Sequence, residues 1–315
     1  MSRVVHTGQA LVDVVVEVPT LPDRGQNVMA TSSTRYAGGA VTVLVAAARF
    51  GATCVHAGAH GTGPHGDLIR AVLAEEGATL SALPVAERDT ATCLVLVEPS
   101  AQRTFVTTLG AEREISVASL ATSAPVAGDL VCVTGYSLAL DSTRDPLLTW
   151  LPTLDPGVLV VLDPGAVFAH LDPAVRDAML RHTDIWSGNA EEAADLLAAV
   201  GDPLGPDDDT MATPASRLAP LLRGDAVTIV RDGAHGCAVH VGGRTTSVPG
   251  FPQDPVDTNG AGDTHTGALV ADVAGGRDWV EACRRANAAA ALKVTRRGPT
   301  SAPTAAEVEA FLAAR

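Results

Sequence analysis

The sequence predicts an α/β protein in which a doubly wound, mostly parallel sheet is flanked by helices, with a small additional β-sheet as a lid. In the second half of the chain, short apolar segments alternate with helical ones, which is the pattern of strand–helix units. Hydrophobic residues make up 46% of the chain but aromatic residues only 3%. The core must therefore be mainly Ala, Val and Leu, as in parallel sheets covered on both faces.

The first third of the chain contributes several strands and two helices. We expect strands at 3–7, 10–18, 27–36 and 53–59, and helices at 41–50 and 67–76. A hairpin is expected at 91–97 and 103–109, joined by a turn that contains Pro99. The segments at about 10–36 and 91–110 are expected to form the small sheet, which as a lid would exclude water from a reaction site.

The rest of the chain supplies the alternating units. We expect strands at 129–134, 158–162, 185–187, 226–231 and 237–241, and helices at 145–154, 173–181, 190–200, 279–295 and 305–314. Residues 201–214 are expected to form a surface loop. Asp163, Asn189 and Gly233 all follow strands. In a parallel sheet these ends meet at one edge, so we expect a single cleft there.

Length and charge limit the classes of protein and partner. The 315 residues fit one large domain, expected to span 1–315, and the net charge of −14 argues against a nucleic-acid or acidic-membrane surface. The five cysteines are scattered without a Cys-x-x-Cys pair, which indicates buried thiols in a reducing compartment. No uninterrupted apolar run reaches 18 residues, and the N-terminus lacks the form of a signal peptide, so we expect a cytoplasmic protein.

The segment from Val256 to Val270 is the most informative in the chain. Gly260 and Gly262 precede a run of small and apolar residues typical of a helix. The first N–H groups of a helix have no internal partner and form an anion site. Asp263 lies at that site, where a carboxylate is useful as a base in phosphoryl transfer to an alcohol. The alternative is that Asp263 or Asp257 only caps the helix.

The single lysine of the chain, Lys293, excludes two kinase architectures. A Walker A loop requires Gly-Lys-Ser/Thr, and a protein kinase requires a lysine on an early strand. If the protein binds ATP, it does so through another arrangement.

Two further motifs in the first third have alternative interpretations. Gly61 to Gly66 has the form Gly-x-Gly-x-x-Gly, but Pro64 removes an amide from it and no acid ends the next strand, which disfavours a dinucleotide-binding dehydrogenase. Cys54, His56, His60 and His65 resemble a zinc-ligand set, but the first two lie within one strand and the others in loops.

Four motifs in the expected order resemble those of the ribokinase-like, or PfkB, carbohydrate kinases, and the resemblance extends over the whole chain. Residues 257–263 resemble the C-terminal signature of that family, and Gly38-Gly39 with the following helix resembles the N-terminal one. Asn189 and Glu192 match its Asn-x-x-Glu motif, and residues 231–236 resemble its nucleotide loop. Together these motifs are far more specific than any one alone.

The resemblance implies an ATP-dependent kinase that phosphorylates a hydroxyl, expected to be primary, of a sugar or sugar derivative. The implied roles follow the motifs: Asp263 as the base; Gly260, Ala261 and Gly262 as the anion hole; Asn189 and Glu192 for Mg²⁺ through water; Arg231, Gly233, Gly236 and Asn287 along the nucleotide; Asp13, Gly38, Gly39, Val43 and Arg103 for the substrate; Asp257, Asn259 and Ser301 for a monovalent cation such as K⁺. The family also suggests a homodimer through the lid.

The sequence departs from the family at four positions. Val43 replaces an asparagine that would hold a sugar hydroxyl, so ribose-type recognition is not expected. Asn259 replaces threonine beside the cation segment. His265 replaces phenylalanine, either as a core substitution or as a contact that alters the pKa of Asp263, and Arg231 replaces a small residue near the phosphates.

Two other functions remain open on the same scaffold. A nucleoside kinase is disfavoured by the low aromatic content, although Tyr36 and Phe105 lie in the lid segments. A non-catalytic sensor of sugars or nucleotides is disfavoured by the presence of Asp263, Asn189 and Glu192 together.

Overall fold

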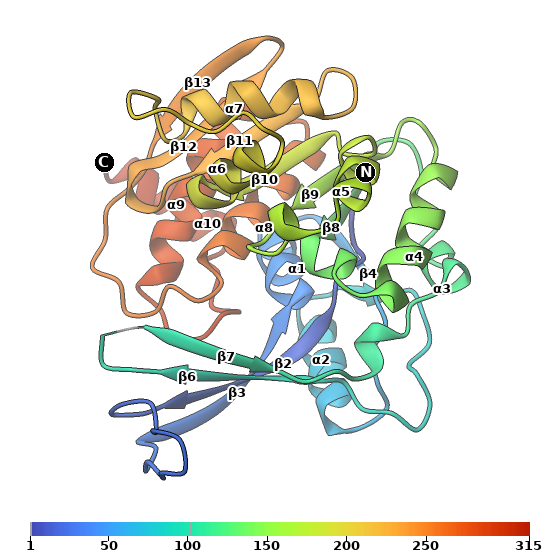
Figure 1. Ribbon diagram of the computed structural model, residues 1–315, viewed down its shortest axis with the longest axis vertical. Coiled ribbons are helices and arrows are strands. Elements are labelled where there is room, and N and C mark those ends of the chain that lie inside the picture. The colour runs from blue at the N-terminus through green and yellow to red at the C-terminus, as the bar shows by residue number, and fades with distance from the viewer. Residues whose placement is uncertain (1, 101) are drawn as a thin grey trace.

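The computed structural model describes residues 2–100 and 102–315, and a large, mostly parallel sheet organises them (Figure 1). In sheet order the strands are β13 (Arg244–Pro249), β12 (Gly236–Val241), β11 (Val227–Arg231), β10 (Ile185–Asn189), β9 (Leu159–Asp163), β8 (Leu130–Thr134), β1 (Arg3–His6), β4 (Thr53–His56) and β5 (Thr79–Leu80). All neighbours are parallel except the β11–β12 and β12–β13 pairs.

Helices cover both faces of this sheet, as the sequence predicts. One apolar cluster contains α1 (Ala40–Arg49), α2 (Pro64–Glu75), α8 (Ala261–Ala274), α9 (Trp279–Val294) and α10 (Ala305–Ala313). The other contains α3 (Val117–Ala121), α4 (Asp141–Trp150), α5 (Pro173–Leu180), α6 (Ala190–Ala199) and α7 (Ala212–Leu218). Val4 belongs to the first cluster and Val5 to the second, because successive strand residues point to opposite faces.

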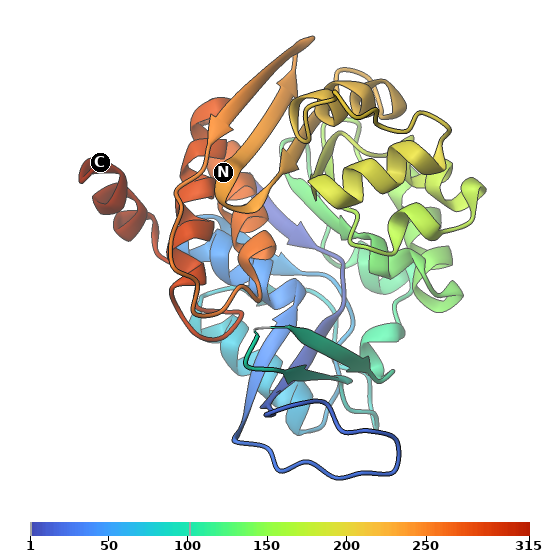
Figure 2. The ribbon, with the colours of Figure 1, turned by 60° about the vertical axis from the view of Figure 1, so that its left-hand side comes forward.

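A second, four-stranded sheet lies at one end of the large one, at the bottom of Figures 1 and 2. Its order is β3 (Ser32–Gly39), β2 (Ala10–Glu17), β6 (Thr92–Val97) and β7 (Arg103–Thr107), with β2 and β6 parallel and the other pairs antiparallel. We call it the small sheet. Its strands come from the two segments in which the sequence indicates a lid. Ion pairs Glu17–Arg297 and Arg103–Asp257 join it to the region after α9 and to the loop before α8.

Several boundaries differ from the predicted ones. The polar strand expected at 27–36 starts at Ser32 and continues to Gly39, so Gly38 and Gly39 pair with Leu11 and Ala10 directly before α1. The helix expected at 145–154 occupies Asp141–Trp150. The loop expected at 201–214 overlaps the first turn of α7. Helix α3 and strand β13 were not predicted.

The glycine motif at 61–66 forms the start of a helix whose N-terminal amides bind a protein carboxylate, not a dinucleotide. Helix α2 begins at Pro64, and the N–H groups of His65 and Gly66 donate to the carboxylate of Asp89 at 3.1 and 2.9 Å. An internal carboxylate thus occupies the N-terminal anion site of this helix. Within the described ranges, no helix is both long and apolar enough to cross a bilayer.

Candidate active site

Two cavities meet at Asp263, beyond the carboxyl ends of the central strands. The first, of about 460 Å³, is bounded by the small sheet and α1, and we call it the small-sheet cavity. The second, of about 560 Å³, is bounded by the glycines of residues 233–236 and 260–262, and we call it the glycine-loop cavity. Asp163, Tyr136, Asn259 and Asp263 line both. The cleft expected at this edge of the sheet therefore has two compartments with a shared border.

Asp263 lies in the first turn of α8, where the chain turns sharply into the helix. Gly260 has φ +78°, and a Cβ there would lie 2.7 Å from the main-chain oxygen of Pro299, so only glycine fits. The N–H of Ala261 donates to Thr258 O at 3.2 Å. The N–H groups of Gly262 and Asp263 have no protein acceptor among the described residues. These amides are free to bind an anion beside the Asp263 carboxylate.

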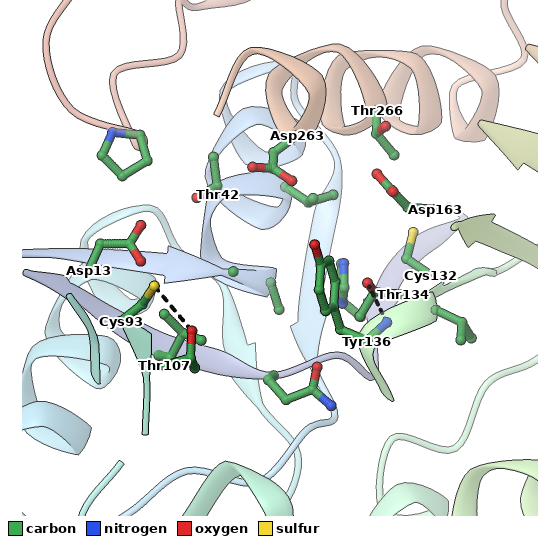
Figure 3. A pocket seen from close by; sticks show the side chains of 18 of the residues that line it. Asp13, Thr42, Cys93, Thr107, Cys132, Thr134, Tyr136, Asp163, Asp263 and Thr266 are labelled. Carbon is green, nitrogen blue, oxygen red and sulfur yellow. Dashed lines mark hydrogen bonds between the residues drawn. The ribbon is translucent and has the colours of Figure 1, made fainter. Parts of the chain in front are cut away.

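Burial, with smaller contributions from the nearby carboxylates of Asp163 and Asp13, raises the pKa of Asp263 to about 7, against the opposing effects of Arg231 and Lys293. Figure 3 shows the Asp13, Asp163 and Asp263 side chains around one cavity, from β2, the end of β9 and the start of α8. A carboxyl group with a pKa near neutrality is matched to taking a proton from a hydroxyl.

Arg231, the last residue of β11, places a positive charge at the start of α8. Its Nη1 donates to Gly262 O at 2.8 Å, and its Nη2 lies 3.8 Å from Asp163 Oδ2. The Nε of Arg231 is buried and has no partner within the described part of the chain. A guanidinium that lines the glycine-loop cavity, adjacent to unpaired helix amides, is suited to a phosphate.

Asn189 and Glu192 form a reciprocal capping box at the start of α6. The Asn189 side chain accepts from Glu192 N, and Glu192 Oε2 accepts from Asn189 N, both at 2.8 Å. Both line the glycine-loop cavity. Burial and the neighbouring Asp163 raise the pKa of Glu192, opposed by Arg231. The spacing of three therefore places the pair at one helix terminus, as the sequence indicates.

On the side of the small sheet, the small-sheet cavity combines the carboxylate of Asp13 with largely apolar walls. Asp13 points into it from β2, and burial raises its pKa to about 6. A Cβ on Gly38 would lie 2.5 Å from Asp13 Oδ2, so this glycine leaves room for the carboxylate. Gly39 and Val43 line the cavity, with apolar contributions from Leu11, Cys93, Phe105, Cys132 and Val161.

The remaining nucleotide candidates line the glycine-loop cavity: Gly233, Gly236 and Asn287. Asn287 Nδ2 donates to Val248 O and Pro249 O at 3.1 Å each, and its Oδ1 lies 3.1 Å from His265 Nε2. His265 is thus held at the wall of this cavity, away from the small-sheet cavity.

Arg103 lies on the glycine-loop side, not in the small-sheet cavity for which the sequence nominates it. Its Nη2 donates to Thr258 Oγ1 at 2.8 Å and to Asp257 Oδ1 at 3.1 Å. It connects the small sheet to the loop that precedes α8.

The three residues nominated for a monovalent cation lie close together in the loops around Asp257. Asp257 Oδ1 accepts from Asn259 N and Oδ2 accepts from Gly298 N, both at 2.9 Å. Ser301 Oγ donates to Gly298 O at 2.7 Å. Protein donors therefore already use both carboxylate oxygens of Asp257.

Several lining residues were not nominated from the sequence. Asp163 was expected at this edge of the sheet, but no role was given to it. Tyr136 and Thr107 belong to elements with no motif, and Thr266 lies one turn after Asp263 on α8; all three line the small-sheet cavity (Figure 3). A carboxylate that directly follows an apolar strand, as Asp163 does, was the one available signal.

Comparison with known proteins identifies the family. The family model described as pfkB family carbohydrate kinase matches residues 1–305. The chain belongs to this family. It is a phosphotransferase with an alcohol acceptor, of the sugar or nucleoside kinase class.

Relatives and solved structures agree with that assignment over the full length. An uncharacterized sugar kinase of Escherichia coli, YegV, is 31% identical, covering 98% of this chain and 93% of its own. A ribokinase of Bacillus subtilis is 27% identical, covering 99% and 100%. Ribokinase of Cryptococcus neoformans in complex with ADP has a TM-score of 0.83 at 23% identity, covering 98% and 99%. Adenosine kinase of Sinorhizobium meliloti has a TM-score of 0.83 at 19% identity, covering 100% of this chain and 99% of its own. Both solved structures share the fold of this chain.

Proposed function

We propose that the protein is an ATP-dependent sugar kinase that transfers the γ-phosphoryl group to a hydroxyl of a carbohydrate or sugar derivative. We expect this hydroxyl to be a primary one. The observation that carries the proposal is the position of Asp263 on the border of two cavities. One cavity offers a second carboxylate for hydroxyl groups, and the other offers free amides and a guanidinium for phosphates. The ADP complex of the structurally similar Cryptococcus neoformans ribokinase supports ATP as the donor.

In this mechanism the acceptor hydroxyl binds in the small-sheet cavity, where Asp13 accepts hydrogen bonds from other hydroxyls. Asp263 takes the proton of the attacking hydroxyl during transfer. The amides of Gly262 and Asp263, with Arg231, stabilise the charge on the transferring phosphoryl group. The small sheet closes the site, which limits transfer to water.

The residues at the phosphate end of the glycine-loop cavity fit Mg²⁺. Asp163, Asn189 and Glu192 present hard oxygen atoms there, and burial raises the pKa of both acids, so a cation would relieve their mutual repulsion. We expect Asn189 and Glu192 to hold the ion through water. When bound, Mg²⁺ neutralises charge on the donor phosphates.

The walls of the glycine-loop cavity suit the rest of the nucleotide. Gly233 and Gly236 let the donor approach the backbone, and Asn287 and His265 flank the base. Phe251, Ala290 and Val294 supply apolar surface for a ring system.

The acceptor is expected to differ from ribose. Val43 contributes an apolar surface where the family has an amide, and Phe105 and Cys93, the latter beside Asp13 on the neighbouring strand, add to the apolar lining of the cavity. An acceptor with an apolar or deoxygenated edge at Val43 fits these walls best, because an unpaired hydroxyl would be desolvated there.

A nucleoside is the second candidate acceptor. Phe105 and Tyr136 line the small-sheet cavity and offer aromatic faces to a base. The structural similarity to an adenosine kinase shows the fold only and adds no preference between the two classes.

The deciding experiment measures ADP release from ATP and Mg²⁺ with hexoses, pentoses, sugar acids and nucleosides. Acceptor-dependent ADP release with a carbohydrate supports the proposal. Turnover confined to nucleosides favours the second candidate. Tight ATP binding without turnover on any acceptor contradicts both and favours a sensor.

The outer face of the small sheet is the surface through which we propose a homodimer. Val14 pairs with Leu94, and Leu94 pairs with Val106, so these side chains share one face. They alternate with Asp13 and Cys93, which line the cavity, and therefore point to the opposite face, where Val14 packs partly against the core and Val106 is exposed. Light scattering should give a dimer mass for the wild type and a monomer mass for Val106→Arg. A monomeric wild type at micromolar concentration contradicts this proposal.

A further inference from the structure

Protein donors already occupy the oxygens of Asp257, the one acid nominated for a monovalent cation. The carboxylate of Asp257 accepts hydrogen bonds from the amides of Asn259 and Gly298, and its Oδ1 also accepts one from Arg103 Nη2. The main-chain oxygen of Asp257 accepts from Lys293 Nζ at 2.8 Å. A cation site needs several oxygens with free lone pairs directed at one point. With all three of its oxygens hydrogen-bonded to protein donors, Asp257 does not fit a bound K⁺.

Lys293 supplies a positive charge at this position from inside the protein. Its side chain is completely buried at the end of α9, and Nζ lies 3.9 Å from Asp257 Oδ2 as well as 2.8 Å from Asp257 O. The N–H groups of Val256 and Asp257 both donate to Val294 O, at 2.7 and 3.0 Å. The ammonium group is therefore fixed to the strand of chain that leads into Gly260 and the anion site.

We propose that the ammonium of Lys293 takes the place of a monovalent cation in positioning the loop before α8, so that turnover does not depend on K⁺. An ammonium and a potassium ion carry the same charge and have similar size. The tethered group is present at every salt concentration and has no binding equilibrium to satisfy. Lys293 is the only lysine of the chain, so no other lysine can replace it. It acts through Asp257 and the adjacent loop and is a positioning residue.

This inference rests on the proposed kinase function, so its test includes a measurement that does not require turnover. The affinity for ADP is measured by calorimetry in KCl and in tetramethylammonium chloride at equal ionic strength. For the wild type we expect the same Kd in both salts, and the same kcat/KM if the acceptor is known. An affinity or turnover that rises several-fold with KCl overturns the proposal even if no acceptor has been found.

Two substitutions at one position separate charge from space. Lys293→Ala removes the charge and leaves room for an ion, and we expect ADP binding and turnover to fall about tenfold in tetramethylammonium and to recover in KCl. Melting temperature should also rise with KCl for this variant, since a bound ion stabilises the folded state. Lys293→Met removes the charge but fills the space, and we expect the same loss without recovery.

Arg285→Ala is the matched control, because Arg285 is also buried on α9 but pairs with Asp272, remote from both cavities. It is expected to lower stability without producing any response specific to K⁺. A Lys293→Ala protein that is unaffected, or whose loss KCl does not reverse, overturns the proposal. If that variant does not fold, the salt comparison on the wild type still decides.

Discussion

Arg231 Nη1 donates a hydrogen bond to the main-chain oxygen of Gly262, 2.8 Å away. This bond ties the end of β11 to the residue that directly precedes Asp263. It places a permanent positive charge beside the first turn of α8, next to Asp263, and a Cβ on Gly262 would lie 2.8 Å from the same Nη1. Glycine at this position and arginine at the strand end therefore depend on each other.

The pH dependence of turnover should report this arrangement. Because Asp263 must be ionised to accept a proton and its pKa is raised to about 7, kcat/KM for the acceptor should increase about tenfold per pH unit below neutrality and level off above it. Arg231 lowers this pKa and Asp163 raises it. Arg231→Met should therefore move the inflection to higher pH, and Asp163→Asn to lower pH. Shifts in the same direction for both variants would contradict the assignment.

Asp263 should also reduce the stability of the folded protein. A carboxyl group whose pKa rises from 3.8 to about 7 on folding contributes stability below pH 3.8, and that contribution is lost as pH rises through 7. Asp263→Asn should therefore unfold at a higher urea concentration than the wild type at pH 8. Its free energy of unfolding should be higher by up to about 4 kcal/mol, which corresponds to the shift of about three pKa units. The advantage should disappear near pH 4. Asp177→Asn, at an exposed position on α5, is the control and should show no such pH-dependent gain.

A cluster of three buried histidines should make the protein sensitive to acid. Burial lowers the pKa of His6 to about 3 and of His56 and His60 to about 4. Their folded pKa lies below the unfolded value of 6.5, so the stability they contribute is present above pH 6.5 and is lost as pH falls, by about 1.4 kcal/mol per unit for each.

Urea unfolding at pH 7 and pH 5 tests this with a matched pair of variants. Between pH 7 and pH 5, the free energy of unfolding of His56→Gln should fall by about 2 kcal/mol less than that of the wild type. His235→Gln, at an exposed position, should follow the wild type. Equal losses in all three proteins would show that the buried cluster does not control acid sensitivity.

Val43 should control acceptor choice. Val43→Asn places an amide in the small-sheet cavity, and we expect kcat/KM to change about tenfold among acceptors, in favour of those with a hydroxyl at that edge. The KM for ATP should stay the same, because Val43 does not line the glycine-loop cavity. Val43→Ala is the control for volume. If it produces the same change among acceptors, added space and not the amide is responsible.

The sequence predicts the fold class correctly because alternating segments and an aliphatic core suffice to indicate a parallel sheet covered by helices. It also contained a missed hairpin: Gly242 and Gly243 have φ of +57° and +73° and connect β12 to β13, as expected for a two-residue turn. Helix α3 was missed because its capping box uses Ser116 and Ser119 instead of an acidic third residue.

The candidate site was predictable only where residues adjacent in sequence act together. Asp263 with its glycines, and Asn189 with Glu192, form local motifs that can be read along the chain. Asp163 and Lys293 gain their importance from contacts with segments remote in sequence. A buried lysine that donates to Asp257 O gives no signal in the sequence beyond being the only one.

The role of Asp263 as the base is tested most directly by comparing ADP affinity and turnover of Asp263→Asn with the wild type, on the acceptor found by the ADP-release assay. The account predicts an ADP affinity within a few-fold of the wild type and a kcat lower by orders of magnitude, because the base is removed while the amides and Arg231 remain. A kcat within a few-fold of the wild type would contradict it.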